Sequence, residues 1–257
     1  LHPLLVSTVL YVIQRMALLS TFFTLIAMIA YLHGRTAIGK GAKHKAWTLL
    51  ATAAFATILA TLSKENGALA PSLCAVIELC LFAPRPPQRR HWASRGVIGL
   101  GLFVPAIIAA IAVAIRLPLA VGGYENRPFT LSERVLTQSR VLWDYIGSFL
   151  LPNGPRLGLF HDDYALSSGL LSPPETLAAI LAWGVLLLVA WQFRQRIPGL
   201  IVGLGIYLVG HALESTILPL LIYFEHRNYL PAIGLAWAIA SVLAHVANAL
   251  RAKLDNP

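Results

Sequence analysis

A short polar interval in the C-terminal part of the chain carries several residues that could do chemistry. Between two long apolar runs, Glu214 is followed by Glu225, His226, Arg227 and Asn228. A charge placed at membrane depth costs roughly 2.5–3.5 kcal/mol, so such residues tend to face a bundle interior or water. Two interpretations are open: an ordinary polar loop with Glu225 and Arg227 paired or solvated, or a polar site on one face of a membrane bundle.

Two further polar clusters are short and local. The turn SKEN at 63–66 contains Lys64 and Glu65, which are either solvated in a helical hairpin turn or part of a site. A polar stripe runs from Arg134 through Arg140 to Asp144, and its simplest interpretation is the wet side of an interfacial helix. Neither cluster defines a reaction by itself.

A triplet of potential metal ligands follows the stripe. His161, Asp162 and Asp163 offer one imidazole and two carboxylates, a set that could bind a divalent cation. Adjacent residues rarely converge on one ion without backbone turns, which favours an ordinary loop. His211 and Glu214, three residues apart on a helix, suit either a shared metal ion or a simple hydrogen bond. The sequence therefore assigns no metal ligands and leaves the use of a divalent cation open.

Together these clusters suit chemistry on an anionic, lipid-linked donor. Arginine can clamp a phosphate through two hydrogen bonds, and a carboxylate can act as a general base or hold a cation that neutralises a leaving phosphate. The sequence contains no Walker loop, dinucleotide fingerprint, nucleophile elbow or zinc-finger spacing. Soluble-enzyme chemistry is therefore disfavoured.

The composition predicts that membrane-spanning helices position these residues. Hydrophobic residues make up 57% of the 257 residues, charged residues only 12%, and the mean hydropathy is +0.70, whereas soluble domains contain about 25% charged residues. Seven apolar stretches approach the roughly 20 residues that cross a bilayer. They are 17–32, 46–62, 67–83, 96–115, 175–193, 197–213 and a last stretch of about 20 residues after Pro231. We expect one all-α polytopic membrane helix bundle over residues 1–257.

The charges divide between the two sides of this bundle. The loops 33–45, 85–95, 194–196 and 251–257 fall on one side and hold 12 of the 20 Lys and Arg residues, while the other side holds 9 of the 11 acids. The positive-inside rule places the basic loops in the cytoplasm. The net charge of +9 is therefore explained by membrane topology and does not indicate a nucleic-acid partner.

Residues 116–174 are a long polar insert that we expect to be structured and extracytoplasmic. Thr130 and Glu133 form a capping-box pattern at its centre. From there Glu133, Thr137, Arg140 and Asp144 follow one polar stripe. The other stripe is apolar and consists of Leu131, Val135, Leu142, Ile146 and Phe149. The pattern predicts an amphipathic helix over 131–151 that lies on, or dips into, the outer leaflet.

Two pairs of small residues are interpreted as packing. Cys74 and Cys80 lie six apart in one apolar segment, a spacing that predicts neither a metal site nor a disulfide. Gly199 and Gly203 form a small-xxx-small face, which favours close contact between helices. The chain begins at Leu1 and stops at Pro257 just after a basic helix end, so we expect it to be a piece of a longer protein.

Four segments resemble a known family. They are HPLLVSTVLYVIQR at 2–15, SKENG at 63–67, RPFTLSERVLTQSRVLWDYIGSFLLPNGPRLGLFHDD at 127–163 and FEHRNYLPAIG at 224–234. In this order they resemble the membrane half of the transmembrane-and-tetratricopeptide-repeat O-mannosyltransferases and their bacterial relatives, which are C-type polytopic glycosyltransferases. The resemblance implies a fragment that lacks both the first extracytoplasmic loop, with its presumed catalytic Asp, and the repeats.

The resemblance also implies an activity. A member would transfer a sugar from a polyprenyl-phosphate-linked donor to a protein or glycan acceptor at the periplasmic face of a bacterial inner membrane. Glu65, Asp162 and Glu225 are the candidate catalytic residues, for cation or acceptor contacts. Arg140 and Arg227 are the first candidates for the donor phosphate. The further candidates for substrate binding are Lys64, Arg134, Asp163, Glu214 and His226.

Two other functions are weighed against the transferase. A non-catalytic membrane scaffold would anchor a tetratricopeptide-repeat domain for envelope partners. A transporter would need charges buried in the middle of helices, where only Glu78 and Glu214 qualify. We rank the scaffold second and the transporter last.

Overall fold

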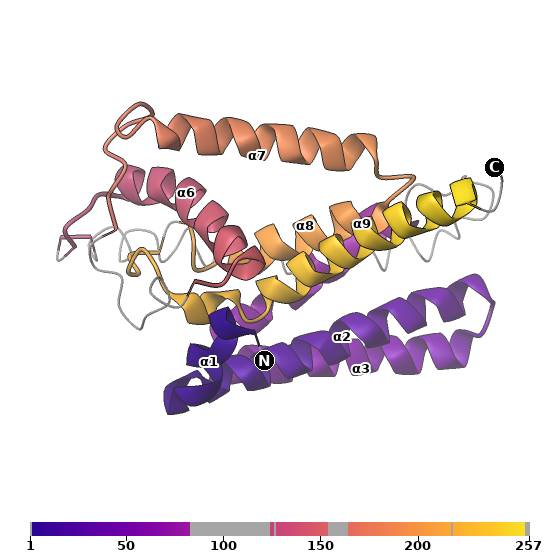
Figure 1. Cartoon of the computed structure of the whole chain (residues 1–257). Coiled ribbons are helices and arrows are strands. Elements are labelled where there is room, and N and C mark those ends of the chain that lie inside the picture. Colours follow the sequence, from indigo (N-terminus) through magenta and orange to yellow (C-terminus); the bar gives the residue numbers. More distant parts are fainter. Residues whose placement is uncertain (1, 83–123, 126, 154–163, 217, 255–257) are drawn as a thin grey trace.

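The structure is a computed structural model, and it describes residues 2–82, 124–125, 127–153, 164–216 and 218–254. In these parts of the chain the regular elements are helices, apart from one isolated bridge between Gly169 and Ser172. Figure 1 shows them as an elongated bundle. The expected all-α class is confirmed for the described residues.

Among the described residues, five helices are long and apolar enough to cross a membrane. They are Val12–Gly39, which contains α2 (Arg15–Gly39), then α3 (Lys43–Ser63), the segment Glu65–Phe82, α7 (Glu175–Gln192) and α9 (Pro231–Leu254). The helix α8 (Pro198–His211) has only 14 residues, or about 21 Å at 1.5 Å per residue, which is short of the roughly 30 Å hydrocarbon core. The expected stretch 96–115 lies outside the described residues, so the count of seven stays a prediction.

The helix α2 is longer than the apolar stretch 17–32 predicted from the sequence. It continues through His33, Gly34 and Arg35 to Gly39, and the chain turns at Gly41 with a φ of 75° before α3 begins. The charge of Arg35 is tolerated in the helix because Glu78 accepts hydrogen bonds from its Nε and Nη2 at 2.9 and 3.0 Å. The expected loop 33–45 is therefore mostly helical.

The segment Glu65–Phe82 is built from three helical types. It begins with the 3₁₀ turn η3 (Glu65–Leu69), continues as α4 (Ala70–Ile77) and ends in the π-helical turn η4 (Glu78–Phe82). Leu73, Cys74 and Ile77 of α4 pack in the main apolar core against residues of α2 and α8, including Met28 and Ile206. Cys74 is a free buried thiol and Cys80 a free, partly buried one.

The helices α8 and α9 approach each other backbone to backbone. A Cβ atom added to Gly203 would lie 2.6 Å from the backbone nitrogen of Ala238 and still closer to the carbonyl oxygen of Gly234. One added to Gly199 would collide with the side chain of Ser241. The small face predicted on α8 thus packs against α9 of the same chain, because only glycine permits this distance.

The helix α6 (Leu131–Leu150) lies at one end of the bundle. Its capping box is confirmed: the Glu133 amide donates to Thr130 Oγ1 at 3.3 Å, and the Thr130 amide donates to Glu133 Oε2 at 2.8 Å. The expected apolar stripe is only partly in contact with the protein: Leu142 packs against a buried cluster and Phe149 stacks on His2. The fully buried positions are Arg134, Thr137, Gln138, Val141 and Tyr145, whereas Val135 is 46% exposed. Contact of the apolar stripe with lipid stays a prediction.

The two ends of the bundle differ in composition. Figure 1 shows that the α2–α3 turn, the α7–α8 turn and the C-terminal end of α9 lie at one end, and that α6 and the segment before α9 lie at the other. The first end carries the basic residues Lys40, Lys43, Lys45, Arg194, Arg196, Arg251 and Lys253. We call it the basic end. The expected basic loops 33–45, 194–196 and 251–254 thus lie at one end, while the loop 85–95 lies outside the described residues.

Candidate functional site

The segment 212–230 crosses the end of the bundle opposite the basic end. It starts after His211, the last residue of α8, and leads into α9 through the 3₁₀ turn η7 (Glu225–Asn228). Much of it has no helical partners for its carbonyl groups, which would be costly to bury unsatisfied. The side chains of α6 provide these partners.

Arg134 of α6 is fully buried and binds the backbone of this segment. Its Nη2 donates to the Glu214 carbonyl at 2.6 Å, its Nε to Thr216 at 3.1 Å, and its Nη1 to Leu221 at 3.2 Å and also to Leu220. The five donors of a guanidinium in a fixed fork suit several carbonyls at once. Arg134 therefore positions the loop that carries Glu214.

Two further residues of the same face of α6 continue this row. Gln138 Nε2 donates to the Ile222 carbonyl at 2.6 Å. The Tyr145 hydroxyl donates to the Phe224 carbonyl at 2.9 Å and accepts from the Phe224 amide at 2.8 Å. Side chains of α6 thus bind backbone carbonyls at several positions between Glu214 and the start of η7.

A buried charge cluster, formed by Lys64, Glu214 and Arg227, is the centre of the candidate site. Lys64 Nζ lies 2.6 Å from Glu214 Oε1, and Arg227 Nε lies 3.7 Å from Glu214 Oε2. The three side chains are 3–6% exposed. Lys64 follows the last residue of α3 and Arg227 lies in η7, so one carboxylate joins segments that are distant in the sequence.

Within the cluster two cations share one carboxylate, and Glu225, also buried, lies two residues before Arg227 in η7. Burial raises the pKa of Glu214, but Lys64 and Arg227 outweigh it, so that the pKa lies below its ordinary value and the carboxylate stays ionised. Burial, together with the cations Lys64 and Arg227, lowers the pKa of His226 to about 4. At neutral pH the imidazole is uncharged, and one carboxylate faces two cations.

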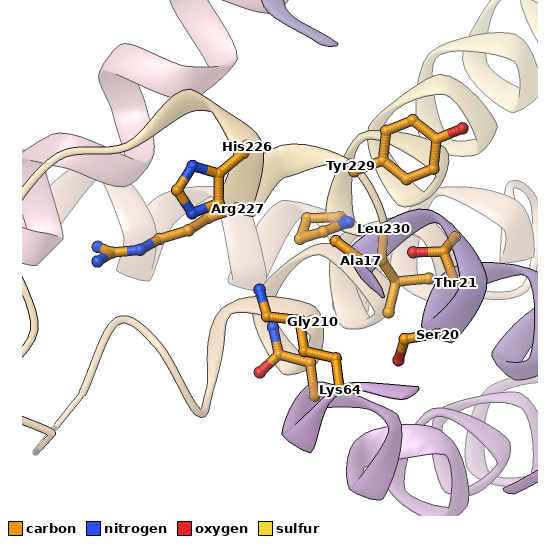
Figure 2. A pocket seen from close by; sticks show the side chains of 11 residues that line it. Ala17, Ser20, Thr21, Lys64, Gly210, His226, Arg227, Tyr229 and Leu230 are labelled. Atoms are coloured by element: carbon orange, nitrogen blue, oxygen red, sulfur yellow. The ribbon is translucent and has the colours of Figure 1, made fainter. Parts of the chain in front are cut away.

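A small cavity of about 20 Å³ adjoins the cluster (Figure 2). Lys64, His226 and Arg227 line it together with Ser20 and Thr21 of α2. This volume holds about one water molecule. The polar lining brings together α2, the end of α3 and the segment before α9, and it offers hydroxyl, imidazole and cationic groups to an anion.

The structure brings together four of the residues predicted for the site: Lys64, Glu214, His226 and Arg227. Glu225 is buried beside them in η7. Glu65, one residue after Lys64, is exposed. Asp162 and Asp163, with His161, lie outside the described residues.

Arg140 does not contact the charge cluster. Its Nη1 donates to the Ala165 carbonyl at 3.0 Å and to Ser167 Oγ at 3.3 Å, and its guanidinium lies over the Tyr164 ring, 5.3 Å from the centroid. It holds the chain that follows the His161–Asp163 triplet. A role for Arg140 at the donor phosphate stays a prediction.

His211 makes no hydrogen bond to Glu214, and a metal role for it stays a prediction. Its ring is buried between Tyr145 and Tyr207, with centroids 5.5 and 4.8 Å away, and Glu214 instead pairs with Lys64. Within the described part of the chain, no three of the His, Cys, Asp and Glu residues are grouped as metal ligands. The use of a divalent cation stays open, because the predicted triplet lies outside the described residues.

The sequence did not indicate that several uncharged polar residues on helices contribute to the candidate site. Ser20 and Thr21 are buried in α2, a helix interpreted only as a span, yet they line the cavity. Gln138 and Tyr145 were not singled out either. Their signal was present, because Arg134, Gln138 and Tyr145 are spaced four and seven residues apart and share one helix face.

No protein-family model, curated protein or solved structure matches this chain. Its function is therefore inferred from its own residues and from the motifs quoted above. What the arrangement can do chemically is bind an anion with two buried cations, one of which is a guanidinium suited to phosphate.

Proposed function

We propose that this chain is part of a membrane glycosyltransferase that uses a polyprenyl-phosphate-linked sugar donor and a protein or glycan acceptor at the periplasmic face of a bacterial inner membrane. One observation carries the proposal: the buried cluster in which Lys64 and Arg227 share the single carboxylate of Glu214, opposite the basic end. A cationic cluster at the outer membrane surface suits a donor whose phosphate is held at that depth.

Arg227 is the residue that we assign to the donor phosphate. Its Nε lies 3.7 Å from Glu214, beyond hydrogen-bond length, whereas Lys64 makes a tight contact of 2.6 Å with the same carboxylate. Arg227 is held less tightly by Glu214 than Lys64 is, so it can more easily exchange the carboxylate for a phosphate. A guanidinium can bind a phosphate through two donors. Lys64 keeps Glu214 in place during this exchange.

The donor needs more room than the described cavity provides. A volume of about 20 Å³ admits a water molecule but no phosphate group. Donor binding therefore includes an outward movement of the segment 212–230 or of the Arg227 side chain. Glu225, Glu65 and Asp162 stay candidates for acceptor contacts.

The test is a glycan profile of cells that carry the full-length protein with Arg227→Ala or Glu225→Gln. Both variants are expected to reduce the glycan product at equal protein level, because the first removes the phosphate ligand and the second a candidate base. Arg227→Lys keeps the positive charge but loses the paired guanidinium donors, so it should retain part of the activity. Arg251→Ala, on the exposed end of α9, is the matched control for a lost arginine. An unchanged glycan profile in both Arg227→Ala and Glu225→Gln would contradict the proposed glycosyltransferase function.

The small size of the cavity favours a second candidate, the non-catalytic scaffold. In that case the charge cluster only fastens the segment 212–230 to the end of α3, through Lys64. Arg227→Glu would then lower the stability of the protein and change no glycan. The same cells and the same glycan profile distinguish the two functions.

A further inference from the structure

A second, larger cavity lies at the basic end of the bundle. It has a volume of about 860 Å³ and opens between the last two turns of α2, the π-helical turn η4 and the α7–α8 turn. This is the size range of small-molecule sites. The charge cluster described above is at the opposite end, so this cavity is a separate feature (Figure 1).

The described lining of this cavity is positively charged. Lys40 comes from the end of α2 and Arg194 from the α7–α8 turn, and His33 of α2 also lines the cavity. No carboxylate is among the described lining residues. The nearby Arg35 is already balanced, because Glu78 accepts two hydrogen bonds from it. Lys40 and Arg194 therefore leave a positive charge that a ligand can neutralise.

The other part of the lining is apolar and is formed by Leu32, Leu81 and Phe82. The Arg194 guanidinium is fixed 4.2 Å from the centroid of the Trp191 ring, and its Nη1 donates to the Trp191 carbonyl at 2.8 Å. Trp191 and Trp47, both near this end, are 58% and 63% exposed. Exposed tryptophans are typical of the membrane–water interface, so the cavity lies at the depth of lipid headgroups.

We propose that this cavity binds the phosphate headgroup of an anionic phospholipid of the leaflet at the basic end. Lys40 and Arg194 contact the phosphate, and Leu32, Leu81 and Phe82 contact the first part of an acyl chain. Basic pockets between membrane helices on the cytoplasmic side suit such headgroups. The apolar part of the lining favours a lipid, because a soluble anion has no acyl chain to contact Leu32, Leu81 and Phe82. The proposal does not depend on the transferase activity.

The test measures lipid binding to the purified chain in detergent by native mass spectrometry, with phosphatidylglycerol and phosphatidylcholine as probes. Wild type is expected to prefer phosphatidylglycerol. Lys40→Gln with Arg194→Gln should weaken its binding by about tenfold or more, because each cation near a headgroup contributes on the order of a fivefold gain in affinity. Arg251→Gln with Lys253→Gln removes the same charge from the same end, on exposed residues of α9 outside the lining, and should retain the preference.

Three results would overturn the proposal. Equal binding of the two lipids by wild type would exclude a headgroup site, and equal losses in the two double variants would indicate diffuse attraction to the surface. Competition by millimolar inorganic phosphate would indicate a soluble anion in place of a lipid. A thermal melt of each variant without added lipid checks folding, and single Lys40→Gln and Arg194→Gln variants replace the double variant if it melts early.

Discussion

A single carboxylate, that of Glu214, compensates two buried cations from distant parts of the chain. Removing one partner of a buried ion pair leaves an uncompensated charge and costs about 3–5 kcal/mol. We therefore expect Glu214→Gln to lower the free energy of unfolding by an amount in that range, measured by denaturant unfolding in detergent micelles.

The control for this variant is Glu65→Gln. Glu65 is an exposed acid one residue from Lys64, and substitutions at such positions change stability by about 0.5 kcal/mol or less. If Glu214→Gln were no less stable than Glu65→Gln, the ion pairs would not hold the segment 212–230 in place.

The low pKa of His226 predicts a loss of stability in mild acid. Burial and the neighbouring cations hold the folded-state pKa at about 4, below the ordinary value of 6.5, so the unfolded state binds the proton more strongly. The stabilisation is complete above pH 6.5 and is lost as the pH falls toward 4. Because the ring is partly exposed, we expect the free energy of unfolding to fall by about 1 kcal/mol over this range.

This expectation is measured as the thermal midpoint of wild type and of His226→Gln between pH 7.5 and 4.5. The variant should lose less stability over the interval than wild type, since glutamine does not titrate. Parallel curves for the two proteins would show that His226 takes no part in the acid sensitivity.

At the scale of elements, the contact between α8 and α9 depends on glycine. Gly203→Ala would place a methyl group 2.6 Å from the Ala238 nitrogen, so the helices must separate. Forcing a methyl group into close packing costs about 1–3 kcal/mol. Gly184 of α7 has nothing within 4 Å of its Cβ position, and Gly184→Ala should be neutral or stabilise by up to about 1 kcal/mol through helix propensity. Thermal unfolding of the two variants tests the difference, and equal effects would contradict the close approach.

The ends of apolar helices could be predicted well where the chemistry of the chain changes abruptly. The stretches 46–62 and 175–193 correspond closely to Lys43–Ser63 and Glu175–Gln192. The end of α2 was wrong by seven residues because the polar run after Leu32 resembles a loop. Its helical state depends on Glu78, a partner 43 residues away that local pattern does not reveal.

The candidate site was predictable in part for a similar reason. Charged residues in an apolar chain stand out, so Lys64, Glu214 and Arg227 could be selected and assigned to one side of the membrane. Which of them meet depends on tertiary contacts, and Arg140 bonds to the chain near Ala165 instead. The use of Arg134 to hold backbone carbonyls was also missed, because an arginine suited to phosphate is equally suited to carbonyl groups.

For the whole molecule, the gathering of basic turns at one end predicts a single orientation. With Cys74 and Cys80 replaced by alanine, a membrane-impermeant maleimide added to intact spheroplasts should label Ser132→Cys at the start of α6. It should label Lys43→Cys at the start of α3 only after the membrane is permeabilised, because the positive-inside rule holds that end in the cytoplasm. Both parent residues are exposed. The reverse pattern would invert the topology and move the charge cluster to the cytoplasm.

The row of hydrogen bonds from Arg134, Gln138 and Tyr145 to the carbonyls between Glu214 and Phe224 has a mechanical consequence. A loop bonded to its own residues can change shape independently, whereas this one is fastened along its length to a helix of 20 residues. Any tilt or rotation of α6, for example when a lipid tail presses against its exposed flank, would carry the Glu214 backbone with it. Movement of α6 would then lengthen or shorten the distances from the Glu214 carboxylate to Lys64 and Arg227.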